Sequence, residues 1–423
     1  MSEWASGLMR SAGLLAVWAG FAIVLAVLPL VFSSPVAITI LNQMGISILF
    51  ALSYNMLLGQ GGMLSFGHAV YFGLGGFFAV HVMNGVDYEG WPIPLPALPF
   101  LGGLFGLLFA LVIGSFSTRR AGTVFAMISL GIGELVAACS IIFVVFFGGE
   151  EGVSADRTMG PPVFGYEFIS EIEVYVLTAV IVFVTTVLMY LFSRTPAGRM
   201  ANAVRDNAER AEFLGYSQRR VRFISFCASG FFAGVAGGLF AINYEILTEE
   251  NLNLVTSGWV LLMAYIGGVG YFVGPMVGAV LLTLLQTVLS NHTEIWRLYL
   301  GILFLLTVMY APSGLTGLVM MHGPAWQAGR LGRLMVPYAR ASLPLLALLV
   351  GAIALLEMLH HLNVSGTAAA VWTVFAHEIA LASIWPWLFA VTLVTLGLWG
   401  LMRCLPELWE AWDDLHVIEA ARR

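Results

Sequence analysis

Residues 194–222 read RTPAGRMANAVRDNAERAEFLGYSQRRVR, a charged stretch enclosed by two long apolar runs. It holds seven Arg and three acidic residues, whereas the runs near 173–193 and 222–243 are predominantly apolar. Each run has the length of about 20 residues that a helix needs to cross a bilayer. The stretch therefore predicts two membrane-spanning helices joined by a charged loop.

Ten further apolar runs continue this pattern on both sides of the loop. They lie near 11–32, 36–58, 62–84, 97–117, 122–147, 257–272, 273–290, 297–312, 342–361 and 384–403. The first is kept as a span because it lacks the small-x-small cleavage site of a signal peptide. We predict an all-α polytopic membrane helix bundle of twelve spans, with about ten in a core and two additional C-terminal spans.

The same runs divide the chain into four predicted parts. Residues 1–320 form a transmembrane domain, 321–341 a basic cytoplasmic linker, 342–403 two additional transmembrane helices and 404–423 a cytoplasmic tail. In the tail, apolar residues recur at near-helical spacing with acidic residues between them, which is typical of an amphipathic helix.

The composition narrows the class of protein. Of the 423 residues, 60% are hydrophobic and 10% are charged, whereas soluble domains are nearer half apolar and a quarter charged. All 18 basic residues are Arg, and the absence of Lys excludes a P-loop ATPase and lysine Schiff-base chemistry. The net charge of −6 is not the basic charge that is typical of a nucleic-acid-binding protein. The three cysteines, Cys139, Cys227 and Cys404, form no metal spacing or disulfide framework.

The arginines also predict an orientation. They gather at 194–222, at Arg119 and Arg120, and at 320–341, whereas 148–173 holds six acidic residues and one Arg, and 244–256 holds three Glu. Because cytoplasmic loops of membrane proteins are enriched in Lys and Arg, the basic loops should face the cytoplasm. Twelve spans then place both termini in the cytoplasm.

Two spans contain dense Gly and Pro. Residues 59–67 read GQGGMLSFG and residues 267–275 read GGVGYFVGP. Broken helices survive at membrane depth only where protein or a water-filled cavity satisfies the backbone, and in transporters such breaks often form binding sites. We predict broken segments at both places. A plain helix–helix turn at the membrane surface is the alternative, and 267–275 falls at a predicted cytoplasmic turn.

Glycines at four-residue spacing indicate close helix packing. One set is Gly230, Gly234 and Gly238, and the second is Gly270, Gly274 and Gly278. Small residues at this spacing let membrane helices approach closely. We expect both faces to lie inside the bundle.

The charged loop carries the signals of a short helix. Asp206 and Glu209 have the spacing of an N-cap and its N3 partner, a variant of the capping box. Gly215 fits the C′ position that ends a helix, so 207–214 should form about two helical turns. A helix this short is marginal alone, which favours a docking partner, with a solvated connector as the alternative.

The loop resembles the ATPase-coupling segment of ABC importer permeases. More narrowly, RDNAERAEFLG followed by a Gly/Ala-rich span is similar to permease subunits of the branched-chain, or hydrophobic, amino acid importers and the related urea and amide importers. Four further motifs share the resemblance, which covers roughly 36–320: Asn55-x3-Gly59 with SFGH at 65–68, FAMISLGIGEL at 125–135, GWVLLMAYIGGVGYFVGPMVGA at 258–279, and APSGLTGL at 311–318.

The resemblance implies a translocation subunit that catalyses nothing itself, in a bacterial cytoplasmic (inner) membrane. Its partners would be two ABC ATPase subunits that hold ATP and Mg, a second and paralogous permease, a periplasmic or extracellular solute-binding protein, and membrane lipid. No cofactor is expected on this chain. The residues implied in ATPase coupling are Arg205, Asp206, Asn207, Glu209, Arg210, Ala211, Leu214 and Gly215.

The sequence departs from the family pattern at two places. The family usually ends soon after the segment matching 311–318, whereas this chain continues for about 100 residues. A basic residue often follows the family's intramembrane Glu, whereas 135–138 reads LVAA. The first departure concerns the subunit arrangement and the second the pairing of Glu134.

Six residues are candidates for the substrate pathway. Glu134 lies near the middle of a predicted span, where a carboxylate is costly and marks a functional position; it could bind a substrate ammonium, relay a proton or fix helix packing. The others surround the first break, where amides and helix N-termini could hold a carboxylate or form a structural turn: Asn55, Gln60, Ser65, Phe66 and His68.

Two alternatives to the importer function are weighed. An ATP-independent secondary transporter or channel would use Glu134 for ion coupling, but the capped helix and its family motif argue against it. A membrane-embedded enzyme has no paired catalytic groups here. Nor is a metal site expected, because HE at 377–378 continues to no zinc-protease motif. The expected solute is a branched-chain or other small amino acid, or a related amide or carboxylate.

Overall fold

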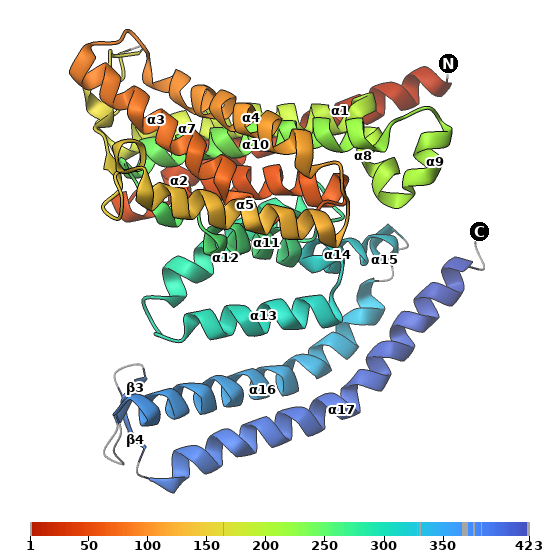
Figure 1. Ribbon diagram of the computed structural model, residues 1–423. Coiled ribbons are helices and arrows are strands. Elements are labelled where there is room, and N and C mark those ends of the chain that lie inside the picture. The colour runs from red at the N-terminus through yellow and green to blue at the C-terminus, as the bar shows by residue number, and fades with distance from the viewer. Residues whose placement is uncertain are drawn as a thin grey trace. The chain divides into compact units, whose positions relative to one another are not determined.

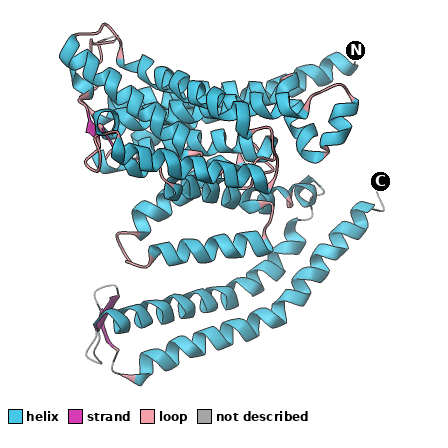
Figure 2. Ribbon diagram, in the orientation of Figure 1, coloured by secondary structure: helices cyan, strands magenta, loops and turns pink. Residues whose placement is uncertain are grey.

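A computed structural model describes residues 2–163, 165–327, 329, 331–365, 371–374, 377–381 and 383–420. The described chain is almost wholly helical (Figure 2), and the predicted all-α class is confirmed. It divides into two compact units, Met1–Val288 with Ile302–Gly317, and Leu289–Gly301 with Leu318–Arg423.

The first unit is a bundle of long helices (Figure 1). Two-residue strands β1 (Val153–Ser154) and β2 (Ile246–Leu247) pair antiparallel. The helices are α1 (Ser2–Val31), α2 (Pro35–Asn55), α3 (Ala69–Glu89), α4 (Leu98–Ser117), α5 (Thr123–Ile142), α6 (Val144–Phe147), α7 (Glu171–Arg194), α8 (Pro196–Asp206), α9 (Ala208–Phe213), α10 (Gln218–Tyr244), α11 (Leu254–Gly267) and α12 (Gly274–Leu284). Helices α13 (Trp296–Tyr310) and α14 (Gly314–Met320) belong partly to each unit.

Among the residues that the structure describes, fewer full-length spans are found than the predicted twelve. In the described chain, eight helices are long and apolar enough to cross a membrane, or nine if the bent pair α13 and α14 counts as one span. Full spans at 257–272 and 273–290 were wrong, because α11 has 14 residues, and α12 has 11 with a π-helical turn of 5 residues, Leu285–Leu289, after it. At 1.5 Å per residue, each is shorter than the hydrocarbon core. They form a hairpin in which α12 packs against α11.

The core of the first unit is built on close backbone contact. Helix α10 packs against α3 and α4. A Cβ built on Gly75 would lie 2.5 Å from the Cα of Gly234, and one on Gly238 would lie 2.6 Å from the Cα of Pro99. These positions therefore admit only glycine without a shift of backbone, as small-residue packing in membranes requires.

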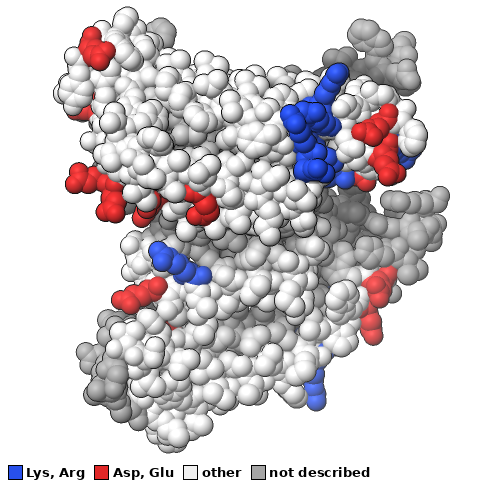
Figure 3. All heavy atoms as spheres, in the orientation of Figure 1, with Lys and Arg blue, Asp and Glu red and all other residues white. Residues whose placement is uncertain are grey.

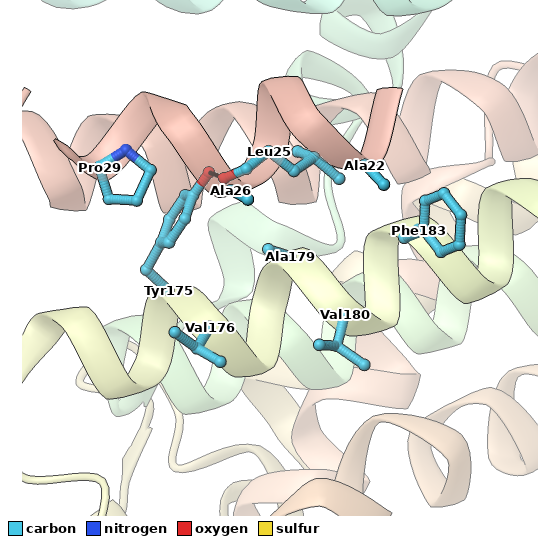
Figure 4. Close-up of a pocket in the computed structure, with 9 residues that line it drawn as sticks. All are labelled: Ala22, Leu25, Ala26, Pro29, Tyr175, Val176, Ala179, Val180 and Phe183. Carbon is cyan, nitrogen blue, oxygen red and sulfur yellow. Dashed lines mark hydrogen bonds between the residues drawn. The ribbon is translucent and has the colours of Figure 1, made fainter. Parts of the chain in front are cut away.

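A proline in α1 explains how that helix is held. Pro29 has no N–H, so the carbonyl of Leu25, four residues earlier, loses its helical donor. The hydroxyl of Tyr175 on α7 donates to that carbonyl at 2.7 Å. The contact borders an apolar cavity of about 390 Å³ between α1 and α7 (Figure 4). A hydrogen bond across two helices thus replaces one lost within a helix.

The connections of the first unit lie at two ends that differ in charge. At one end, Arg119 shares a recess with Arg219 and Arg220. Figure 3 shows arginines gathered at this end, where α8 and α9 lie. At the other end the β1–β2 pair joins the acidic loops 148–173 and 244–256. The helices therefore alternate between the ends in the order that the charge pattern predicts.

Arg157 organises the acidic end. Its side chain is 7% exposed and pairs with Glu171 at 2.7 Å. The guanidinium also donates to the carbonyls of Phe168, Ile242 and Asn243. Next to it, the amide and hydroxyl of Thr158 donate to Asp156 and hold the pKa of that carboxyl below its ordinary value.

The second unit contains two long helices joined by a hairpin. They are α16 (Leu331–Ser365) and α17 (Ile384–Ala420), with α15 (Gly323–Gln327) before them and strands β3 (Val371–Val374) and β4 (His377–Ala380) between them. Arg340 and Glu407 join the two helices at 2.9 Å. The predicted boundaries at 341/342 and 403/404 fall inside α16 and α17, so the linker and the tail are continuous with the helices beside them.

Candidate functional site

The first broken segment lies where it was expected, after α2. That helix continues into a π-helical turn, Met56–Gln60, and the chain is then non-helical until α3 begins at Ala69. Serine side chains of α5 and α11 satisfy the freed backbone: Ser129 accepts from the Phe66 N–H and Ser257 from the Ala69 N–H, both at 3.0 Å. The break is thus satisfied by protein, as the membrane interior demands.

Three of the six pathway candidates lie in this packed segment. Ser65 and His68 are buried, and the Ser65 carbonyl accepts from the Tyr54 hydroxyl at 3.0 Å. The His68 ring stacks on Phe50, and its Nε2 lies 2.9 Å from the Ser53 hydroxyl. In this chain, Ser65 and His68 are thus hydrogen-bonded within the break, and Phe66 contributes its backbone N–H.

The other side of the break opens on a cavity of about 340 Å³ at the basic end, which we call the arginine cavity. Both broken segments contribute to its walls, and so does the loop at 194–222. The lining residues are Asn55, Gly59, Gln60, Ser193, Arg194, Arg199, Asn202, Arg205, Val269, Gly270, Tyr271 and Phe272. Tertiary folding therefore unites three segments that the sequence marks separately.

Arg205 connects helix α8 to the break. Its guanidinium donates to the carbonyl of Gly59 and to Asp206 at 2.9 Å. A Cβ on Gly62, whose φ is +63°, would lie 2.7 Å from the Arg205 Cγ. A residue implied in ATPase coupling thus contacts the broken span directly.

The charged loop forms two helices, and the predicted cap was wrong. Asp206 is the last residue of α8, and Asn207 caps α9, with its Oδ1 accepting from the Arg210 N–H at 2.9 Å. The missed signal is Thr195–Pro196, which begins α8 with Thr195 as cap and Pro at N1. Gly215 ends the pair as predicted, with a φ of +87°.

Helix α9 turns one apolar face inward and another outward. Ala211 is 1% exposed and packs with Ala201, Val204 and Val221. Phe213 and Leu214 are 90% and 67% exposed. Large apolar side chains at the tip of a charged loop are typical of a contact surface. The residues predicted for ATPase coupling did not include Phe213. Its position two residues before Gly215, at the end of the predicted helix, could have indicated that it belongs to this surface.

Glu134 lies apart from the other candidates. The face of α5 that packs inward carries Phe125, Ala126, Ser129, Gly133 and Ser140, whereas Glu134 is exposed together with Met127 and Leu135. In the described part of the chain it makes no ion pair. The structure therefore brings Asn55 and Gln60 together with Arg205 and leaves Glu134 on an outward face.

The packing glycines differ among themselves. Gly230, Gly234 and Gly238 face α4. Gly274 and Gly278 pack inside the α11–α12 hairpin, against Gly268 and Met263. Gly270 instead lines the arginine cavity, and a Cβ there would meet nothing within 4 Å.

No metal-binding cluster of His, Cys, Asp or Glu occurs among the residues that the structure describes. The side chains of His377 and Glu378 fall outside that description.

Comparison with known proteins points to one family. Residues 36–310 match the family described as the branched-chain amino acid transport system permease component. The high-affinity branched-chain amino acid transport system permease protein LivM of Escherichia coli (strain K12) is 26% identical over 294 residues, 64% of this chain and 67% of the relative.

Two further relatives extend the comparison. The probable branched-chain amino acid transport permease protein LivH of Methanocaldococcus jannaschii is 23% identical, over 53% of this chain and 74% of the relative. The autoinducer 2 import system permease protein LsrC of Enterobacter sp. (strain 638) is 27% identical, over 53% and 67%. No solved structure matches significantly.

Proposed function

This chain belongs to the family of branched-chain amino acid permease components, and we propose that it is the membrane subunit of an ATP-driven importer for a branched-chain or other small amino acid, or a related amide or carboxylate. It lies in a bacterial inner membrane with both termini in the cytoplasm. Two ABC ATPases with ATP and Mg, a second permease and a solute-binding protein complete the transporter.

The contact between Arg205 and Gly59 is the observation that carries this proposal. It ties α8 to the broken span, while α9 presents Phe213 and Leu214 outward. An ATPase that binds Phe213 and Leu214 can therefore move the membrane helices through the hydrogen bond between Arg205 and Gly59. A solvated connector needs neither the link nor the apolar tip.

The outward face of α5 fits the second permease. A carboxylate within a span is costly against lipid, and such residues face other helices or water. Because Glu134 is exposed in the described chain, the second subunit or a watery pathway between the two must cover it. The chain matches relatives named LivM and LivH, which supports a paralogous pair.

Reconstitution tests the proposal against the secondary-transporter alternative. In proteoliposomes that contain both permeases, the ATPases and the binding protein, uptake of labelled leucine should require ATP and ignore an imposed proton or sodium gradient. Because ATP supplies the energy, Glu134→Gln should retain substantial uptake. Gradient-driven uptake without ATP, abolished by Glu134→Gln in a normally assembled complex, would instead establish ion coupling.

A further inference from the structure

A second cavity lined by arginines lies where α4 ends and α10 begins. Its volume is about 520 Å³, and we call it the basic recess. Arg119 lines it from the turn after α4, and Arg219 and Arg220 line it from the first turn of α10. None of its described lining residues is acidic. The neutral residues in its walls include Ser115, Thr118 and Phe223.

The positive charge of the basic recess is not neutralised within the described chain. None of its three arginines makes an ion pair with a described residue. The Nε of Arg119 donates to the carbonyl of Ser115 at 3.0 Å, which orients the side chain but does not pair its charge. The acidic residue nearest to α10 in the charged loop, Glu212, already accepts from the Gln218 amide. Because three cations that share one recess repel one another, an anion from outside the chain would stabilise them.

The basic recess lies at the boundary between two spans and the charged connections. Leu95–Ser117 and Gln218–Tyr244 are both long and apolar enough to cross a membrane, and the three arginines lie at the ends of these spans. Exposed apolar side chains begin within one helical turn of them. Phe116, in the last turn of α4, is 47% exposed, and Ile224, four residues after Arg220, is 45% exposed. Since residues four apart are neighbours on a helix surface, the recess is bordered by apolar surface on its membrane side.

We propose that the basic recess binds the phosphate of an anionic membrane lipid such as phosphatidylglycerol. The three guanidinium groups would contact the phosphate oxygens, for which arginine is well suited, and the acyl chains would lie along Phe116 and Ile224. Basic pockets between membrane helices hold anionic headgroups in this way. Inorganic phosphate offers the same oxyanion, but it would not cover the apolar surface beside the recess.

The charge of the lipid should decide how tightly it binds. Phosphatidylglycerol carries a net negative charge, because its phosphate is its only ionised group. In phosphatidylcholine a quaternary ammonium lies close to the phosphate, and the three arginines would repel it. The two lipids can carry identical acyl chains, so the difference between their affinities measures the electrostatic part of the contact.

A lipid bound in the basic recess would connect the ends of two helices, because its phosphate would contact arginines from both. Helix α10 begins soon after Gly215, the residue that ends α9. The lipid would therefore also hold this end of the charged loop at the membrane surface. The site requires neither the solute nor ATP, so it extends beyond the importer function.

Arg120 provides a matched control. It follows Arg119 directly and is likewise exposed, and it makes no ion pair with a described residue. It is not among the described residues that line the basic recess. Arg120→Gln therefore removes the same charge from the same end of the spans and leaves the recess intact. This variant separates binding in the recess from a general attraction between basic residues and an anionic lipid.

The test uses the full-length chain alone, purified and delipidated in detergent. The thermal unfolding midpoint is followed during titration with dioleoylphosphatidylglycerol, and separately with dioleoylphosphatidylcholine or inorganic phosphate. A ligand that binds only the folded state raises the midpoint as its concentration passes the Kd. The two lipids test the charge, and inorganic phosphate tests whether the oxyanion suffices without acyl chains.

Phosphatidylglycerol should raise the midpoint and should have the lowest apparent Kd of the three probes. One basic side chain near an anionic lipid contributes about fivefold in affinity, so Arg219→Gln should raise the apparent Kd by about that factor. Arg219→Gln combined with Arg220→Gln should raise it about 25-fold. The Arg120→Gln control should leave it nearly unchanged. Because the arginines of the basic recess are exposed, these variants should fold normally.

Several outcomes would overturn the proposal. One is the absence of a saturable response to phosphatidylglycerol, and another is an equal affinity for the choline lipid. An equal response to inorganic phosphate at the same concentration would assign the basic recess to a free anion instead. An equal loss of affinity in Arg120→Gln and Arg219→Gln would leave only a general attraction to anionic lipid. Because the test uses this chain alone, its result does not depend on whether the importer proposal holds.

Discussion

At the scale of single residues, this chain repairs broken helices with individual hydrogen bonds. Proline in α1 removes a helical hydrogen bond, and the glycine-rich segment after α2 leaves the helical conformation, so side chains from other helices supply the missing partners. Tyr175 does so for Leu25, and Ser129 and Ser257 do so for the broken segment. In lipid no water can substitute for these partners.

The link between α1 and α7 can be tested by a double-mutant cycle. Tyr175→Phe should destabilise the protein by about 1 kcal/mol, the usual net value of one hydrogen bond. In a Pro29→Ala background the same change should cost less, because the introduced alanine can donate its own N–H to the Leu25 carbonyl. Unfolding in detergent with increasing SDS measures both effects. Equal costs in the two backgrounds would show that Tyr175 acts only through packing.

The buried arginine at the acidic end makes a sharper prediction. Arg157→Lys keeps the charge but cannot reach Glu171 and the three carbonyls together, because an ammonium lacks the forked geometry of a guanidinium. We expect a loss of about 2–3 kcal/mol in unfolding free energy. Glu171→Gln is the control, and its effect should be smaller since that side chain is 33% exposed. A lysine variant as stable as wild type would refute this role.

At the scale of elements, helix ends determine what each segment can do. The α11–α12 hairpin stops short of a full span because Gly268, at φ +115°, turns the chain. In the charged loop, the Asn207 cap separates α8 from α9, and Gly215 ends α9. One helix can thus contact the membrane domain while the other presents its tip outward.

Changing the two ends of α9 should uncouple the transporter. Asn207→Ala removes a cap typically worth about 1 kcal/mol, and Gly215→Val opposes the left-handed backbone there. In the reconstituted transporter, the pair should lower solute-stimulated ATP hydrolysis and uptake together. Ser217→Ala is the control, because that side chain is exposed and makes no capping hydrogen bond, so the change should have little effect. If solute still stimulates ATP hydrolysis fully in the double variant, α9 serves only to connect its neighbours.

At the scale of the whole molecule, the chain divides into two compact units. The family match ends at residue 310 and lies mainly in the first unit. The second unit has its own contacts: Arg340 with Glu407, and Tyr299 with the buried Glu357 at 2.7 Å. The long C-terminal helices therefore lie outside the segment that matches the family.

A shortened chain tests that division. A protein that ends after residue 325 should still co-purify with its ATPases and the second permease, since α8, α9 and the arginine cavity precede the cut. Its thermal midpoint should fall, because Tyr299 loses Glu357. If no complex is recovered while the truncated chain still inserts in the membrane, the second unit belongs to the core assembly.

Orientation in the membrane is a separate whole-molecule prediction. Single cysteines at Ser217 and Ser154 lie at the basic and acidic ends, and both positions are exposed. In right-side-out vesicles of a variant without native cysteines, an impermeant maleimide should label position 154 only. Inverted vesicles should reverse the result. Labelling of both positions from one side would contradict the orientation that the arginine-rich loops predict.

The sequence by itself determined the local features. Apolar runs gave the helical membrane class, glycines marked the break after α2, arginines marked one end of the bundle, and Gly215 marked a helix terminus. These signals reside in a few neighbouring residues, because hydropathy, left-handed backbone and missing N–H groups act locally. The family motifs are also short stretches of neighbouring residues, so the sequence was enough to indicate the family.

Only the tertiary structure decided which features meet. The Arg205–Gly59 bond joins residues 146 positions apart, and no local pattern predicts it. The same holds for the outward face of Glu134, which depends on the helices that pack around α5. It holds too for the short hairpin at 254–289. Its apolar run predicts two full spans, but the packing of Gly267 and Gly268 against Gly274 and Gly314 sets where each helix ends.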